Sequence, residues 1–503
     1  MSHQGQAGPS RLIRACGLVL LAYPWLAAVT GCAVGPDYKP PETEVPANWT
    51  GPTPPAGPEE PAVAAEDLAH WWTRFQDPVL TSLVERALTG NLNLKQAEAR
   101  IRQAQAARGI AFSGLGPTAD LSGSFRRSRS PGGPAALTSN NYQTGLDATW
   151  NLDVIGGSRR NVEAADADLQ AAVEARRDLQ VALAAEVALN YIDVRAFEQR
   201  VTIARENLTT QQHSAEVVRT RFRAGFVGAL DVANAEAQVA TTASQIATLE
   251  ASARQAIYNL SVLLGQEPAA LVEELSPGRA IPAAPPRMPL GIPSDLLRRR
   301  PDVRQAEAQI HASTARIGVA EADLFPQVTI SGSAGFQGTR ASSWLDWANR
   351  FWAFGPTVSW QLFTTGRVLS NIALAQALEE QSLLTYRQTV LTALQQVENA
   401  LVAGAKEEER RQALADAVAA NRKAVALATQ LYTQGQTDFL NVLQAQGALY
   451  ATEDALVQST SAVSTNLVAL YQALGGGWDE EPSAGSPPPA VSTQRREDPE
   501  KKD

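Results

Sequence analysis

The chain of 503 residues contains two tandem copies of one sequence repeat, and this repeat constrains the fold more than any other feature. Residues 96–101 recur as residues 305–310, at an offset of 209 residues. Further along the offset becomes 210, and it is kept by Trp and Gly residues that do not match by composition alone: Trp150 and Trp360, Gly156 and Gly366, Gly225 and Gly435, Gly265 and Gly475. The repeat predicts two equivalent halves rather than several unrelated domains.

The repeat and the flanking composition divide the chain into six segments. We interpret residues 1–31 as a signal peptide, 32–66 as a Pro-rich extended tether, 67–265 as repeat 1, 266–292 as a linker, 293–475 as repeat 2 and 476–503 as a disordered tail.

Each repeat contains two short segments in which apolar and polar residues alternate, the period of a β-strand. The four predicted strands are residues 119–127, 142–153, 327–337 and 354–363. Their length suits tilted strands that cross a membrane, although a half-buried soluble sheet shows the same alternation. On the membrane interpretation the polar face lines a lumen, with these predicted members: Gln143, Asp147, Asn151, Thr329 and Ser333.

Four strands cannot close a membrane barrel, because an open edge leaves backbone groups unpaired in hydrocarbon. Membrane barrels begin at about eight strands. A barrel shared between chains is therefore expected, with eight strands from two copies or twelve from three.

The remaining sequence is helical. Residues 158–223 contain neither Pro nor Gly, and residues 367–433 match them with a single interior Gly404. A helix of this length spans ~100 Å. Gly225 and Gly435 mark hairpin tips, after which residues 230–264 and 440–474 return as shorter helices. Residues 79–112 and 294–322 are expected to stack end to end on the returning helices.

The N-terminal residues have the pattern of a secretory signal peptide. Arg11 and Arg14 precede an apolar stretch that ends in Val29-Thr30-Gly31-Cys32, which looks like a lipoprotein cleavage site with lipid on Cys32. The alternative is an ordinary signal peptide followed by a chance Cys. A lipidated Cys32 would hold the protein on a membrane.

The composition argues against a catalytic or metal-binding site in this chain. The two Cys lie in the first 32 residues, and the four His are scattered. A metal site, a disulfide framework and a Cys/His nucleophile are therefore not expected, and we predict no cofactor and no enzyme activity. The net charge of −9 argues against a nucleic-acid partner.

Three motifs resemble a known family. They are residues 71–78 (WWTRFQDP), residues 292–303 (IPSDLLRRRPDV) followed by Leu324-Phe325-Pro326, and residues 32–38 (CAVGPDY). Together they resemble the TolC-like outer-membrane factors, in their lipoprotein NodT/OprM-like branch, from Cys32 to about Gly477.

The resemblance implies an α+β membrane protein, a homotrimer with a 12-stranded β-barrel in the outer membrane of a Gram-negative bacterium and a 12-helix α-barrel in the periplasm. It implies the exit channel of a tripartite efflux pump, with a periplasmic adaptor (membrane fusion protein) and an inner-membrane RND transporter as partners. A protein-secretion duct of type I shares this fold and stays open as an alternative. A trimeric coiled-coil structural lipoprotein is an alternative of another class.

In this family a ring of Asp after the second tip commonly lines the periplasmic gate. The matching positions here are Asn441 and Gln444, and neither is acidic. The first tip carries Asp231 and Asn234, and Asp438 lies near the second. We therefore predict weaker cation attraction at the gate than is usual in the family, unless these polar residues are only helix caps.

Overall fold

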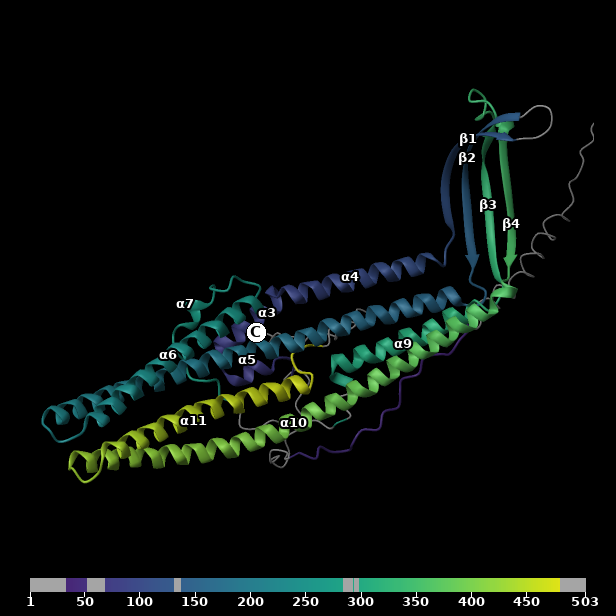
Figure 1. Ribbon diagram of the computed structural model, residues 1–503. Coiled ribbons are helices and arrows are strands. Elements are labelled where there is room, and N and C mark those ends of the chain that lie inside the picture. Colours follow the sequence, from purple (N-terminus) through teal and green to yellow (C-terminus); the bar gives the residue numbers. More distant parts are fainter. Residues whose placement is uncertain (1–32, 52–67, 131–136, 284–292, 294–297, 480–503) are drawn as a thin grey trace, which may run out of the picture.

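The computed structural model describes residues 33–51, 68–130, 137–283, 293 and 298–479, and Figure 1 shows an elongated molecule with a sheet at one end. Cys32, the predicted signal segment and the predicted tail from residue 480 onward lie outside the described residues. The described chain combines β-hairpins with long helical hairpins and confirms the predicted fold class.

Four antiparallel strands form one sheet in the order β1-β2-β3-β4. Their bounds are β1 (Thr118–Ser130), β2 (Leu137–Leu152), β3 (Gln327–Gly338) and β4 (Arg350–Ser359). The register is unbroken, so side chains alternate between two faces along every strand.

The strand ends differ from the predicted ones. β1 and β2 continue beyond residues 127 and 142 because Ser128 still pairs with Ser139, where both strands are polar and apolar alternation has ended. β4 starts at Arg350 and ends at Ser359, so the predicted end at residue 363 is wrong. Trp360 instead donates its indole N–H to the carbonyl of Leu324 (3.1 Å), and a 3-10 helix η3 (Leu362–Thr364) follows.

Two helical hairpins extend from the sheet (Figure 1). The long helices are α5 (Gly157–Arg223, 67 residues) and α10 (Thr365–Thr433, 69 residues), and the returning helices α6 (Ala229–Leu263) and α11 (Phe439–Ala473) have 35 residues each. Gly225 (φ +80°) and Gly435 (φ +74°) adopt the left-handed conformation that ends each long helix.

Three shorter helices cover the sheet-side half of the long ones or lie at mid-height: α3 (Pro78–Gly90), α4 (Leu92–Ser113) and α9 (Pro301–Ala322). The predicted single segment 79–112 is two helices, because the Asn91 side chain accepts hydrogen bonds from the N–H groups of Asn93 and Leu94 and starts a new helix. α4 packs on α5, whereas α9 packs on both α5 and α10. A short helix α7 (Val272–Leu275) lies within the predicted linker.

The apolar core lies at mid-height, where the short and long helices meet. The 3-10 helix η1 (Trp71–Phe75) enters it, and the Trp71 ring stacks on Tyr471 with centroids 5.1 Å apart. Trp478 is buried, and the guanidinium groups of Arg177 and Arg304 lie 4.6 and 5.3 Å from the centre of its ring. The prediction that disorder starts at residue 476 is therefore wrong for residues 476–479.

Within the described part of the chain, no helix combines the length and the apolar character needed to cross a membrane.

Candidate functional site: the helical tips, the sheet faces and the N-terminal segment

The two hairpin tips lie side by side at the end opposite the sheet (Figure 1). A small apolar cluster joins them, separate from the mid-height core. Its buried members come from all four hairpin helices: Ala215, Val218, Ala235, Tyr432, Phe439 and Val442. The tips therefore form one packed unit at the far end of the helices.

Arg221 makes the polar link between the tips. Its guanidinium donates to the carbonyls of Tyr432 (2.8 Å) and Thr433 (3.0 Å) and lies 4.6 Å from the centre of the Tyr432 ring. Both carbonyls lie at the C-terminus of α10, where a cation is favourable, and the Tyr432 carbonyl also accepts the Gly435 N–H (3.0 Å). Arg221 is not among the residues predicted from the sequence, although Arg in the last turn of a helix is a known signal of carbonyl capping.

The predicted gate residues all lie at this end. Asn441 and Gln444 are exposed one turn apart near the start of α11, and Asn441 donates to the Thr437 hydroxyl (2.6 Å). Asp231 and Asn234 are half-buried at the equivalent place on α6. The exposed side chain of Asp438 accepts no hydrogen bond at the start of α11, so it does not act as a helix cap.

The predicted lumen residues share one face of the sheet. Asp147 pairs directly with Ser333, and Asn151 with Thr329. The Thr329 hydroxyl and the Asn151 amide oxygen are 2.7 Å apart. Gln143 pairs with Gln337 on the same face. The five residues thus form one continuous polar surface across β2 and β3.

The opposite face of the sheet is apolar and exposed. Its large side chains include Leu121, Phe125, Leu146, Trp150, Trp352, Phe354 and Val358. A contiguous apolar surface of this kind marks a contact with a membrane or another protein.

Two glycines on the polar face let strands β2 and β3 approach. Gly145 pairs with Gly335, and a Cβ atom on Gly335 would lie 2.1 Å from the Thr144 carbonyl oxygen. The Phe351 ring from β4 reaches over to Gly145, where a Cβ atom would lie 3.3 Å from it. This part of the sheet therefore accepts no side chain at Gly335.

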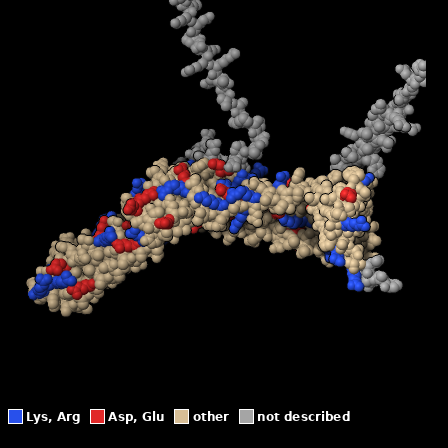
Figure 2. Space-filling view, turned by 90° about the horizontal axis from the view of Figure 1, so that it is seen from above, with Lys and Arg blue, Asp and Glu red and all other residues tan. Residues whose placement is uncertain are grey.

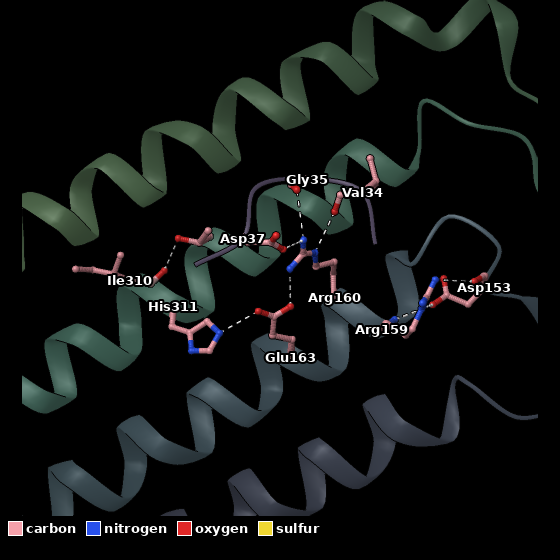
Figure 3. A network of polar contacts seen from close by, with 10 residues as sticks. Val34, Gly35, Asp37, Asp153, Arg159, Arg160, Glu163, Ile310 and His311 are labelled. Atoms are coloured by element: carbon pink, nitrogen blue, oxygen red, sulfur yellow. Dashed lines mark hydrogen bonds and ion pairs between the residues drawn. The ribbon is translucent and has the colours of Figure 1, made fainter. Parts of the chain in front are cut away.

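The N-terminal segment is held where the sheet meets the helices. The buried Arg160 guanidinium donates to the carbonyls of Val34 (3.0 Å) and Gly35 (3.3 Å) and pairs with Asp37 (2.6 Å) (Figure 3). Glu163 accepts from Arg160 (2.8 Å) and lies 3.0 Å from the His311 ring nitrogen.

Burial opposes ionisation of Glu163, but its hydrogen bonds from Arg160 and His311 prevail and lower its pKa below the ordinary value. The Tyr38 ring stacks on His311, with centroids 4.4 Å apart. The cluster therefore ties the N-terminal segment to α5 and α9 together.

Close backbone contacts fix the first described residues. The Val34 N–H donates to the Ile155 carbonyl (3.0 Å), and a Cβ atom on Gly156 would lie 2.6 Å from the Cα atom of Ala33. Ala33, the residue after Cys32, is thus placed at the junction of β2 and α5. In the described residues, no three His, Cys, Asp or Glu side chains gather as a metal site.

Comparisons with known proteins agree with this geometry. A family model described as outer membrane efflux protein matches residues 83–266 and 292–476, one match for each repeat. Nodulation protein T of Rhizobium leguminosarum bv. trifolii is 34% identical over 462 residues, covering 91% of this chain and 97% of that protein. The toluene efflux pump outer membrane protein TtgF of Pseudomonas putida is 31% identical over 461 residues, covering 90% and 95%.

Among solved structures, the outer-membrane channel OprN superimposes with a TM-score of 0.82 at 38% identity, over 89% of this chain and 100% of that one.

Proposed function

Since this chain belongs to the outer membrane efflux protein family, we propose that it is the exit duct of a tripartite efflux pump of the RND type. The duct carries small toxic compounds across the periplasm and the outer membrane, and a periplasmic adaptor and an inner-membrane transporter complete the pump. The observation that carries the proposal is that the family model matches both repeats. Each repeat contributes two strands to the sheet and one helical hairpin.

The repeat supports a homotrimer. On α10, Leu374, Leu384 and Leu391 are 60%, 55% and 62% exposed. The α5 residues that match them at the offset of 210 are Ala164, Glu174 and Val181, and each is at most 4% exposed. This helix packs against α9 of the second repeat in the same chain. A neighbouring copy would cover α10 with its α4 in the same way, and three copies would close a 12-stranded barrel and a 12-helix barrel.

The helical tips are the proposed gate and adaptor-binding end. Arg221 and the apolar cluster hold the two tips together. Exposed apolar side chains on both tips, Phe226 (79%), Leu230 (71%) and Leu440 (51%), offer a surface for the adaptor.

Cys32 is the proposed lipid attachment site. The contacts of Val34, Gly35 and Asp37 with Arg160 support it, because they bring the chain directly after Cys32 to the foot of the sheet. Lipid attached there would lie at the foot of the sheet.

The duct itself is proposed to be passive and to have no enzyme activity, with the energy spent by the inner-membrane transporter. The efflux-pump names of its relatives favour this role over a protein-secretion duct.

Two measurements test the proposal. Deletion of this gene should sensitise the cell to the same toxic compounds as deletion of the partner pump, and the purified protein should conduct ions in planar bilayers. A non-conducting protein would favour the structural lipoprotein, and a secretion defect without drug sensitivity would favour the protein-secretion duct.

A further inference from the structure

The apolar face of the sheet ends in arginines at its loop end. The register places Arg127 and Arg129 on the same face as Leu121 and Phe125. Arg350 lies on that face at the start of β4, two residues before Trp352. All three arginines are exposed. On this face of the sheet, the three arginines therefore border the apolar surface at the end farther from the helices.

Within the described part of the chain these arginines have no acidic partners. Among the described residues, no carboxylate forms an ion pair with Arg127, Arg129 or Arg350. Arg350 donates to the Trp347 carbonyl (2.8 Å) and lies 4.8 Å from the centre of the Trp347 ring, and neither contact supplies a negative charge. Figure 2 shows blue side chains spread over the sheet end of the molecule, with less red among them.

An aromatic row lies immediately below the charges. Phe125 and Tyr142 are in contact at 4.7 Å between ring centroids, and Tyr142 is 6.4 Å from Trp344. Trp352 on β4 is 78% exposed. Aromatic side chains gather at the depth where hydrocarbon meets lipid headgroups. The three arginines therefore lie at headgroup level if the apolar face contacts lipid.

We propose that Arg127, Arg129 and Arg350 bind the phosphate groups of a phosphorylated glycolipid in the outer leaflet of the outer membrane. Guanidinium groups match phosphate with two parallel hydrogen bonds, and their apolar stems lie along the acyl boundary. The inference rests on the proposed function, because that function sets the outer-membrane position of the sheet.

The placement on edge strands adds to the site. β1 and β4 are the two edges of the sheet in one chain. Closure of the proposed barrel sets β4 of one copy beside β1 of the next, so Arg350 and the Arg127–Arg129 pair meet at each subunit boundary. One glycolipid headgroup with two phosphates can then bridge two copies, which makes three such sites for each trimer.

The test compares lipid binding by the purified full-length protein in detergent. The probes are bisphosphorylated lipid A, dephosphorylated lipid A and inorganic phosphate. The triple variant R127Q/R129Q/R350Q should bind bisphosphorylated lipid A at least about tenfold more weakly than the wild type. The Arg126→Gln variant is the matched control, because Arg126 is the adjacent residue on the opposite face of β1. Its affinity should change by less than about twofold.

Four results would overturn the site: unchanged affinity in the triple variant, an equal loss in Arg126→Gln, equal binding of dephosphorylated lipid A, or full competition by inorganic phosphate, which would indicate a free-phosphate site. If the triple variant does not fold, the Arg129→Gln variant alone should still weaken binding, and R127K/R129K/R350K, which keeps the charge but not the paired hydrogen bonds, should bind more weakly than the wild type and more tightly than the Arg-to-Gln variants.

Wild-type conductance separates the two proposals. A wild-type protein that binds the lipid but does not conduct would contradict the proposed duct alone. If the wild-type protein conducts but these substitutions leave its affinity for lipid A unchanged, the lipid site alone would be contradicted.

Discussion

The Arg221 side chain crosses from the first hairpin to the second and donates to the backbone carbonyl of Tyr432 at 2.8 Å. The same guanidinium lies 4.6 Å from the centre of the Tyr432 ring. One residue thus combines capping of the α10 C-terminus with contact to the apolar cluster that joins the tips. Its loss would remove the donor to the Thr433 carbonyl, leave the Tyr432 carbonyl with only the Gly435 N–H, and weaken that cluster.

We predict that Arg221→Ala raises the resting conductance of the channel several-fold, because the tips separate more easily. Planar-bilayer recordings measure this. Arg223→Ala is the control, since the ion pair that Arg223 forms among the described residues is with Glu216 on its own helix. Equal conductance in the wild type and Arg221→Ala would show that the link does not restrain the tips.

Cation block at the tips should be weak in the wild type, because Asn441 and Gln444 carry no charge. Asp231→Asn should remove whatever block remains, and the double variant N441D/Q444D should bind multivalent cations more strongly by at least about tenfold. The measurement is the current at increasing concentrations of a trivalent cation on the periplasmic side. Strong block of the wild type would contradict the prediction.

Substitution of Gly335 by Ala should disrupt the pairing of β2 and β3. The added Cβ atom would lie 2.1 Å from the Thr144 carbonyl oxygen, so backbone must move. The expected cost is roughly 1–3 kcal/mol per chain. Heat-induced dissociation of the trimer should occur at a lower temperature. Gly355→Ala, on the same face with no atom within 4 Å of the added Cβ, should leave that temperature unchanged.

Trp478→Ala should destabilise the protein by about 3 kcal/mol, because it removes a buried ring that packs against the guanidinium groups of Arg177 and Arg304. Thermal unfolding followed by circular dichroism measures the change. Lys423→Ala on α10 is the control, since Lys423 and the matching α5 residue His213 are both exposed. A similar loss in both variants would show that Trp478 has no special part in the core.

The contact between the N-terminal segment and α10 should be sensitive to acid. Burial alone would raise the pKa of Glu398, but the N–H groups of Thr50 and Gly51 and the Thr50 hydroxyl donate to it and lower that pKa overall. A lowered folded-state pKa means that the contact is fully present above the unfolded value of about 4.3 and is lost as the pH falls through the folded value.

Hydrogen exchange at the Thr50 and Gly51 amides measures this. Exchange relative to the intrinsic rate should rise below about pH 4 in the wild type and at every pH in Glu398→Gln. Protection that stays constant into acid would show that other contacts hold the segment.

The helices were predictable from the sequence because Pro and Gly define their ends. The predicted ends at residues 223 and 433 agree with Arg223 and Thr433, each followed by a left-handed Gly. The break at Asn91 was not predicted, because Asn is tolerated inside helices and only its cap geometry distinguishes the two cases. The strand ends were shifted, since pairing continues through serines that carry no apolar alternation.

The candidate site residues were predictable only where the two-residue alternation along a strand or the repeat offset fixes their position. Alternation placed Asp147 and Ser333 on one face, and the register agrees. The Arg221 link and the burial of Trp478 depend on residues more than 170 positions apart in the chain. No local pattern in one sequence contains such contacts, so only the folded structure reveals them.

The length of α5 has a mechanical consequence. Tyr191 is fixed in the mid-height core, and the helix continues without interruption to Arg223 at the tip. That stretch is a lever of about 50 Å. A rotation of about 5° at the core would move the tip by about 4 Å, more than the width of a water molecule. A partner that binds only at mid-height could therefore open or close the helical tips without contacting them.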